Sequence, residues 1–315
     1  MRTLVKTPQL AGTFVPGDPH SGYYNDLRVH VAAHAQGPGP AEGLLAFERL
    51  TRNRTAAYPI VVVQIGIGAW MLIDTDPGWR EVVARTADWI VDDMDADGLI
   101  PFLHPFPHTF RLDPPWYSAL CQGEAASFLI RAARTLGEPG LEVAAAKAGR
   151  SLVESSGGLV AMTPEGPVLQ EYPTDPPAHV LNGWIFALWG LYDLSVSIDD
   201  REPFETAFRQ GIAALSARLP LYGIGRNWSR YDLFPHPVAN TASPFYHRLH
   251  IELLAAMNAL VHRDAFVQWG VKWQAGEEDR IARSEAIARK ILFRAARPRS
   301  ALLNSILGSP SRRAR

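Results

Sequence analysis

Residues 180–198 read VLNGWIFALWGLYDLSVSI, a run in which apolar and small residues occupy nearly every side of a helix. A helix without a polar face is buried in a protein core. Residues 202–219 carry apolar side chains at helical spacing on one face only, which predicts a half-exposed helix. The short polar sequence SIDDRE joins the two segments. The pair therefore predicts a hairpin of one buried and one half-exposed helix.

The same pairing recurs three more times along the chain. Each time, an apolar or small-residue segment is followed, after a short polar joint, by an amphipathic one. These predicted pairs are 60–73 with 78–94, 118–136 with 141–155, and 247–261 with 265–293, the last broken near Gly276. Buried inner helices and half-exposed outer helices together predict an all-α fold, an (α/α) toroid or barrel of about four helical hairpins.

Four longer segments, rich in aromatic residues, His, Arg and Pro, run into the N-terminal ends of the predicted inner helices. They read FERLTRNRTAAYP (47–59), LHPFPHTFRLDPPWYS (103–118), LQEYPTDPPAH (169–179) and NWSRYDLFPHPVANTASPFYH (227–247). Because the inner helices all start at the same end of the ring, these segments share one mouth. Helix N-termini carry unpaired N–H groups and the positive end of the helix dipole, which favour carboxylates. We therefore expect a carbohydrate-sized cleft at this mouth.

The sequence divides into three parts. Residues 1–46 form a predicted N-terminal arm with a strand candidate at 27–32 and with room for a β-hairpin, 47–295 form the helical domain, and 296–315 form a basic, disordered tail. Residues 152–169 are expected to add a small β-hairpin near the mouth, with its turn at Pro164–Gly166.

Composition excludes several classes of partner. The formal net charge of -1 provides no general attraction for nucleic acid or an anionic membrane. One cysteine, Cys121, excludes an internal disulfide and fits a reducing compartment. The start of the chain has no sustained apolar segment of the kind found in signal peptides, and the run 58–73 contains Gln64 and is too short to span a bilayer. These features predict a cytoplasmic location, without a membrane span or a nucleic-acid partner.

Two of the long segments carry groups suited to proton transfer. Glu171 and Tyr172 precede prolines that stiffen their loop. Tyr231 lies between Arg230 and Asp232, and a cation beside a buried tyrosine is expected to lower its pKa. The alternatives are a carboxylate in solvent beside a tyrosine packed on proline, and a structural tyrosine beside a surface arginine.

Other residues at the mouth are candidates for contacts with substrate. Arg111 offers a fork for a carboxylate, and Trp116, near Gln122, offers a flat face for a sugar ring. The alternative is that Trp116 is a core residue and Arg111 an outer charge. His247 and His250 share a helix face after Tyr246, and we interpret them as hydrogen-bonding or charge-balancing residues rather than a metal pair. His104 and His108 are further candidates for lining the mouth, and the alternative is that both are ordinary surface residues.

The combination of motifs resembles the C-terminal catalytic region of the D-glucuronyl C5-epimerases. The resemblance runs from about residue 58 to 272 and includes, in the order of the family, PWYSA with QG (115–123), EYPT (171–174), VLNG to GLYD (180–193), LPLY (219–222), YDL (231–233) and YHxxHI (246–251). These enzymes convert D-glucuronate to L-iduronate within heparosan-type chains. The order and spacing of so many segments make chance agreement improbable.

The resemblance implies an (α/α) barrel and a proton-transfer mechanism without a cofactor or metal. The family's catalytic glutamate and tyrosines carry over to Glu171, Tyr172, Tyr231 and Tyr246. The expected substrate-binding residues are Arg111, Trp116, Gln122, Asn182, Arg230, His247 and His250. The expected partner is a glucuronate-containing polysaccharide or oligosaccharide, and a homodimer is left open.

The chain departs from the family at two points. The family commonly has Arg directly after Tyr-Asp-Leu, a position suited to holding the uronate carboxylate, and this chain has Phe234 there. Arg230 or Arg111 is the expected substitute. Animal members also carry a long β-rich region before the helices, so their dimer contacts and any calcium site there do not transfer to this short arm.

Three other activities use the same kind of cleft. A uronate polysaccharide lyase starts with the same proton abstraction, and a non-catalytic glycan-binding protein would keep the aromatic mouth. A glycoside hydrolase would need two facing carboxylates, for which Glu171 with Glu124 or Asp175 is a weak candidate pair. The sequence contains no Gly-rich phosphate loop, no Cys cluster and no GxSxG motif.

Overall fold

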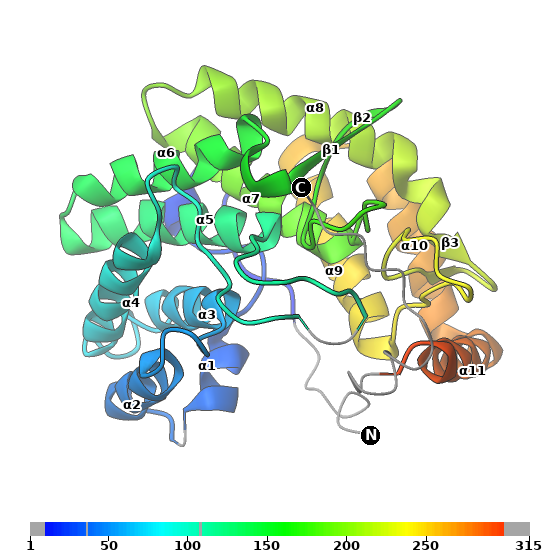
Figure 1. Ribbon diagram of the computed structural model, residues 1–315, viewed down its shortest axis with the longest axis horizontal. Helices are drawn as coiled ribbons and strands as arrows, with labels where there is room; N and C mark the ends of the chain where they lie inside the picture. Colours follow the sequence, from blue (N-terminus) through cyan, green and yellow to red (C-terminus); the bar gives the residue numbers. More distant parts are fainter. Residues whose placement is uncertain (1–9, 36, 107–108, 299–315) are drawn as a thin grey trace.

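The computed structural model describes residues 10–298 except 36, 107 and 108. Helices follow one another around an arc that begins at α2 and α4 and ends at α10 and α11 (Figure 1). The helices are α1 (Arg28–His34), α2 (Pro40–Thr51), α3 (Pro59–Trp70), α4 (Trp79–Asp93), α5 (Ala119–Leu136), α6 (Gly140–Val153), α7 (Leu181–Ser197), α8 (Glu202–Arg218), α9 (Pro244–Val261), α10 (Asp264–Glu278) and α11 (Arg280–Ala296). The antiparallel strand pairs are β1 (Val160–Thr163) with β2 (Gly166–Leu169), and β3 (Gly223–Ile224) with β4 (Trp228–Ser229).

The predicted four hairpins are confirmed as α3–α4, α5–α6, α7–α8 and α9–α10. Helix α7 buries nearly its whole length, including Trp184 and Trp189, because the sequence leaves it no polar face. Helix α8, in contrast, buries one stripe of apolar residues and exposes Glu202, Glu205 and Arg209. The chain therefore forms an (α/α) toroid with buried inner helices.

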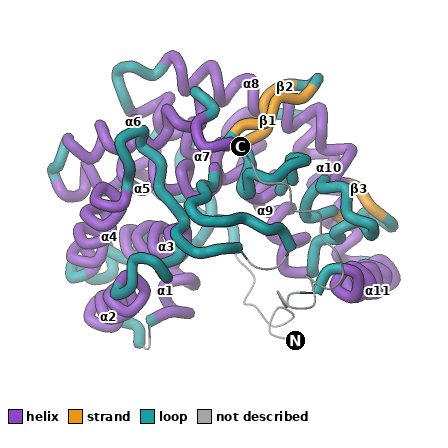
Figure 2. The backbone as a smooth tube through the Cα atoms, in the orientation of Figure 1, coloured by secondary structure: helices purple, strands orange, loops and turns teal. Residues whose placement is uncertain are grey.

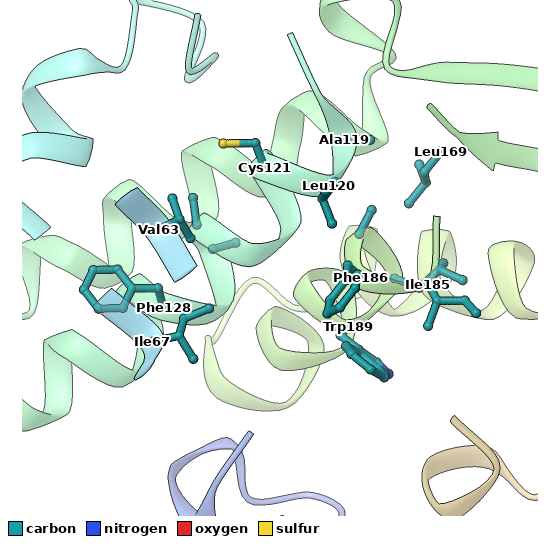
Figure 3. Packing of buried hydrophobic residues seen from close by; sticks show 14 of the residues in the cluster. Val63, Ile67, Ala119, Leu120, Cys121, Phe128, Leu169, Ile185, Phe186 and Trp189 are labelled. Atoms are coloured by element: carbon teal, nitrogen blue, oxygen red, sulfur yellow. The ribbon is translucent and has the colours of Figure 1, made fainter. Parts of the chain in front are cut away.

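The core lies between the inner helices α3, α5 and α7. Val63 and Ile67 of α3 lie near Phe128 of α5, and Phe186 and Trp189 of α7 lie in the same cluster (Figure 3). Each of these side chains is at most 2% exposed. At the transfer free energy of about 25 cal/mol per Å² of apolar surface, such a layer stabilises the ring strongly.

Helices α5 and α7 approach so closely that only glycine fits at their contact. A Cβ added at Gly190 would lie 2.3 Å from the carbonyl oxygen of Gly123 and 2.5 Å from its Cα. Backbone atoms on both sides cannot move aside as a flexible side chain would. The spacing of the two innermost helices is therefore set by these two glycines.

Gly190→Ala is expected to destabilise the protein by about 1–3 kcal/mol, the usual cost of overfilling a packed core. Gly140→Ala is the matched control, because a Cβ at Gly140 meets no atom within 4 Å. Urea unfolding of both variants measures the difference in the free energy of unfolding. A Gly190→Ala variant as stable as the control would mean that α5 and α7 are not in this close contact.

The predicted helix bounds agree with the structure within a few residues, and the β-hairpin is confirmed as β1–β2. The break expected near Gly276 occurs instead at Asp279, which caps α11 by accepting the N–H of Ile281. Gly276 lies within α10 and packs against the backbone of Asn227, where a Cβ would lie 2.1 Å from the carbonyl oxygen. Close packing, rather than a break, explains this glycine.

The N-terminal arm differs from the prediction. The expected strand at residues 27–32 is wrong, because the structure has helix α1 there; within the described part of the arm, pairing is limited to isolated bridges such as Ala11 with Asn25. Gly68 of α3 provides the groove for this helix, since a Cβ there would lie 2.5 Å from both the Leu27 carbonyl oxygen and Val31. Helix α2 also crosses the expected boundary at 46, and the predicted tail lies outside the described residues from 299 onward.

A buried polar network fastens the arm to the ring. The Arg131 guanidinium of α5 lies 2.6 Å from the Asp193 carboxylate of α7 and donates to the carbonyl oxygen of Gly22. The Tyr24 hydroxyl donates to Asp193 as well. Arg131 and Asp193 are both 0% exposed, so their charges depend on each other for stabilisation. Within the described part of the chain, no helix has the length and hydropathy needed to cross a membrane.

Candidate active site

The long segments meet at the end of the ring where the inner helices begin. The loop before α5 crosses the face of the molecule between α3 and α9, and the loops before α7 and α9 lie beside it (Figure 2). Backbone hydrogen bonds tie these loops together. The Ala119 N–H donates to the Gln170 carbonyl, and the Leu181 N–H donates to the Tyr231 carbonyl. Residues far apart in the sequence are therefore held at fixed positions around one mouth.

Glu171 lies at this mouth, in the loop before α7, with its side chain against the first turn of that helix. Its carboxylate packs on Gly183, where an added Cβ would lie 2.4 Å from Oε2. The Asn182 side-chain amide donates to the same oxygen at 3.5 Å. Glu171 is only 6% exposed. Sequence and packing thus hold one carboxylate at the N-terminus of a buried helix.

Burial gives this carboxylate an unusual affinity for protons. Desolvation raises the pKa of Glu171 to about 7, and the nearby Asp232 adds to the rise. Hydrogen bonds from the Tyr172 and Tyr231 hydroxyls oppose it. A carboxylate with such a pKa can both remove and return a proton near neutral pH.

Tyrosine rings surround Glu171. The Tyr231 and Tyr246 ring centres are 4.8 Å apart, at an interplanar angle of 69°. Desolvation is the largest cause that raises the pKa of both Tyr172 and Tyr231. The charge of Glu171 is the next largest cause, and Tyr246 adds to both shifts. The structure thus brings together Glu171, Tyr172, Tyr231 and Tyr246, the four residues singled out as catalytic.

The expectation that Arg230 lowers the pKa of Tyr231 is wrong. Burial and the charge of Glu171 raise it well above the usual value. Arg230 instead lies near Tyr222, a buried residue whose hydroxyl donates to the carbonyl of His179, and opposes the rise of its pKa. Tyr231 is therefore a protonated hydroxyl at neutral pH.

A fifth member of the cluster, Tyr58, is not among the residues predicted from the sequence. It immediately precedes α3, and desolvation followed by the charge of Glu171 raises its pKa, with Tyr246 contributing. Its ring stacks on His104 with centres 4.8 Å apart, which agrees with the expectation that His104 lines the mouth; His108 lies outside the described residues. Tyr58 lies near the end of the first long segment, where residues at the mouth are expected. No acidic or basic neighbour in the sequence indicated a catalytic role for it.

Trp116 does not offer its face to the mouth. Its ring stacks on Phe102 with centres 4.0 Å apart, and its indole N–H donates to the carbonyl of His104. The side chain is 4% exposed. The alternative of a core residue is therefore correct, and Trp116 supports the ring of Tyr172 from behind at 5.9 Å.

Gln122 is also a structural residue. Its amide oxygen accepts the N–H of Ile100, and its amide nitrogen donates to the carbonyls of Gly98 and Ala148 and to the Ser151 hydroxyl. It is 0% exposed. Because both amide atoms are bonded within the protein, the prediction that Gln122 contacts substrate is wrong.

His247 and His250 are buried beneath the mouth instead of lining it. Nδ1 of His247 accepts the Ser229 N–H, and Nε2 lies 3.0 Å from the Trp273 carbonyl. Desolvation lowers the pKa of His247 to about 4 and that of His250 well below its usual value. Both are neutral structural residues, which corrects their assignment to substrate binding. Among the described residues, no group of three or more His, Cys, Asp and Glu is placed to hold a metal ion.

Asp232 and its partners form a second layer behind Tyr231. The buried Asp232 carboxylate accepts from the Asn240 amide, and Asp232 Oδ1 lies 3.3 Å from Nε2 of His236. The Asn240 side-chain oxygen accepts from Nζ of Lys290 at 2.7 Å. Arg111, the predicted carboxylate fork, is an exposed loop residue. The charges behind the site thus come from the loop before α9 and from α11.

Comparison with known proteins identifies the family. The family model described as D-glucuronyl C5-epimerase C-terminus matches residues 95–275. The D-glucuronyl C5-epimerase of Caenorhabditis elegans is 31% identical over an alignment of 207 residues that covers 59% of this chain and 33% of that protein. The chain therefore spans about a third of the length of this relative.

Two solved structures share the architecture. The unsaturated glucuronyl hydrolase of Bacillus sp. GL1 has a TM-score of 0.51 and 12% identity, covering 86% of this chain and 78% of that one. The cellobiose 2-epimerase of Spirochaeta thermophila has a TM-score of 0.52 and 14% identity, covering 87% and 79%. At such identities, both support the fold alone. The family model, in contrast, covers more than half of the chain and includes Glu171 and Tyr231, so the chain belongs to the D-glucuronyl C5-epimerase C-terminus family.

Proposed function

We propose that this chain inverts C5 of D-glucuronate residues in a polysaccharide, giving L-iduronate by proton transfer without a cofactor. The observation that carries the proposal is a buried carboxylate, Glu171, with its pKa raised to about 7 among tyrosine hydroxyls whose pKa values are raised as well. Inversion at one carbon requires a base with a pKa near 7 that removes the proton from one face. It also requires a protonated group that donates a proton to the opposite face. Membership of the family supports the same activity.

The reaction assigns different tasks to the two kinds of group. The Glu171 carboxylate removes the C5 proton, and the electron pair of the broken C–H bond moves onto the sugar's carboxylate. A tyrosine hydroxyl then donates its proton to the opposite face of C5, where the new C–H bond forms. Tyr231 and Tyr246 are the proposed donors; burial and the charge of Glu171 keep the Tyr231 hydroxyl protonated, and the Tyr246 ring lies edge to face with that of Tyr231 at 4.8 Å. Tyr172 hydrogen-bonds to Glu171 and positions it.

The intermediate carries a second negative charge on the sugar acid. General acid–base catalysis supplies about 10²–10⁴ in rate, so stabilising that charge must supply much of the remainder. The N-terminus of α7 and the Asn182 amide lie beside Glu171 and present dipoles to this region. Because these dipoles carry no net charge, they only partly stabilise the second negative charge of the intermediate.

The hydrolase alternative loses Glu124 as a partner for Glu171. Glu124 is 0% exposed, and its oxygens accept from Gln64 at 2.9 Å and Tyr23 at 3.1 Å. Desolvation raises its pKa to about 8, so it is a neutral core residue at pH 7. It therefore cannot face Glu171 across a glycosidic bond.

Proton NMR of a glucuronate-containing polysaccharide incubated with the protein in D₂O tests the proposal. The expected result is the growth of iduronate signals together with loss of the C5 proton signal. A rise in ultraviolet absorbance from an unsaturated uronate would assign a lyase instead, and new reducing ends would assign a hydrolase. Binding without any of these changes would leave a glycan-binding protein and would contradict the proposal.

A further inference from the structure

The proposed reaction needs a positive charge that the predicted site residues do not provide. Among the described residues, the groups that most strongly shift the pKa values of Glu171, Tyr172 and Tyr231 are carboxylates and tyrosines. Arg230 lies by Tyr222 and Arg111 is exposed on its loop. A doubly charged intermediate in such surroundings would be unfavourable without a cation close to the sugar acid.

Helix α11 brings a lysine to the edge of the catalytic cluster. Nζ of Lys290 lies 5.8 Å from the ring centre of Tyr231 and 5.1 Å from that of Phe293. It donates to the Asn240 side-chain oxygen at 2.7 Å. The carbonyl of the same Asn240 accepts the Tyr231 N–H. Lys290 is thus attached to the loop that carries Tyr231, and its charge lies beside the ring of that tyrosine.

The substitution of Phe234 for the family's arginine is coupled to this arrangement. Phe234 contacts His236 with ring centres 4.7 Å apart, and His236 contacts Phe293 of α11 at 5.0 Å. An aromatic column therefore packs α11 against the loop where the arginine is missing. Helix α11 begins after residue 275, the end of the match to the family. In this chain, therefore, a cation from α11, Lys290, lies beside the site.

A second contact fixes α11 across the mouth. Nη1 of Arg294 donates to the Thr109 hydroxyl at 3.2 Å, on the long loop before α5. Lys290 and Arg294 are four residues apart, so they lie on the same face of the helix. The face of α11 that carries these two cations is therefore the face toward the site.

We propose that Lys290 holds the carboxylate of the reacting sugar and makes the site selective for an acidic sugar. This proposal rests on the proposed function. It gives Lys290 of α11 the role that the resemblance implies for the family's arginine after Tyr-Asp-Leu. An ammonium binds a carboxylate as a compact point charge, and Nζ of Lys290 is held over the ring of Phe293, 5.1 Å from its centre. The same charge stabilises the intermediate that forms when the C5 proton leaves.

Three variants test this assignment. Lys290→Gln removes the charge, Lys290→Met removes it while keeping an unbranched apolar side chain, and Lys290→Arg keeps it. The matched control is Arg289→Gln, because Arg289 is on the same helix but 44% exposed and paired with Glu285 at 2.8 Å. Thermal unfolding of each variant establishes that the fold is retained.

The readouts are C5 deuterium exchange and calorimetric binding of two matched oligosaccharides, one with glucuronate and one with its carboxyl groups reduced to alcohols. Lys290→Gln and Lys290→Met are expected to lower kcat/KM for exchange by about 10²-fold, the low end of the loss seen when one charge-stabilising donor is removed. They should also bind the two oligosaccharides equally, whereas wild type, Arg289→Gln and, to a lesser extent, Lys290→Arg prefer the acidic one.

Each outcome separates this proposal from the proposed function. Wild-type preference for the acidic oligosaccharide in a folded Lys290→Gln or Lys290→Met variant would overturn the role of Lys290, even with normal exchange in wild type. Loss of that preference supports the role. If wild type catalyses no exchange but the preference still depends on Lys290, the carboxylate site stands and the proposed epimerisation fails.

Discussion

Glu171→Gln is expected to lower the rate of deuterium exchange at C5 by at least about 10²–10⁴-fold, the contribution of a well-placed general base. Glutamine has nearly the same shape, so it fits against Gly183 and can still accept from Asn182. It cannot accept the C5 proton. The loss should therefore appear in the chemical step, with little change in binding of the oligosaccharide.

The pH dependence gives a second, independent signature of the same residue. Because the base acts as the carboxylate and burial raises its pKa to about 7, the wild-type rate should rise with pH through about 7 and level off above it. Below that pH the protonated acid cannot remove a proton. The residual activity of Glu171→Gln should lack this rise.

Glu165→Gln is the matched control for the carboxylate change. Glu165 lies in the β1–β2 turn, is partly exposed, and pairs with Arg218 at 2.6 Å, so its replacement should leave exchange unchanged. A Glu171→Gln variant that exchanges C5 at the wild-type rate would remove Glu171 from the mechanism. A wild-type profile without a rise near pH 7 would contradict the raised pKa.

Arg131→Met is expected to cause the largest loss of stability, about 3–5 kcal/mol, because it leaves the Asp193 charge buried without its partner. Both side chains are 0% exposed, and Arg131 also donates to the carbonyls of Ser127 and Gly22. Loss of the Gly22 contacts should loosen the N-terminal arm as well. Methionine keeps most of the apolar stem, so the change tests the charge.

Denaturant unfolding measures this prediction, with Arg150→Met as the control. Arg150 pairs with Asp200 at the surface, where both side chains are about half exposed, and such pairs contribute about 0–1 kcal/mol. The double variant Arg131→Met/Asp193→Leu should be more stable than Arg131→Met alone, because no unpaired charge remains. Equal losses for Arg131→Met and Arg150→Met would show that the buried pair is not important for stability.

The helical ring could be predicted from the sequence because its signal is local. Apolar segments such as 180–198 and amphipathic segments such as 202–219 differ in periodicity, and burial follows from periodicity alone. Helix α1 could not be predicted in the same way. It has seven residues and depends on the groove at Gly68, a contact with a helix distant in the sequence.

The candidate catalytic cluster was predictable only in part, for the same reason. Glu171 and Tyr231 each have chemically informative neighbours in the sequence, whereas Tyr58 joins them only through the fold. The errors came from polar residues at the helix ends. Gln122 and His247 find their hydrogen-bond partners on other elements, and a sequence cannot show that those partners leave no group for substrate.

Early-conversion NMR in D₂O tests the central claim most directly, because it reports on both faces of C5 in one reaction. If Glu171 takes the proton and a tyrosine returns one from the other side, the first iduronate formed carries deuterium at C5 while unreacted glucuronate still carries protium. Iduronate that retains the original proton, or no iduronate at all, would contradict the account.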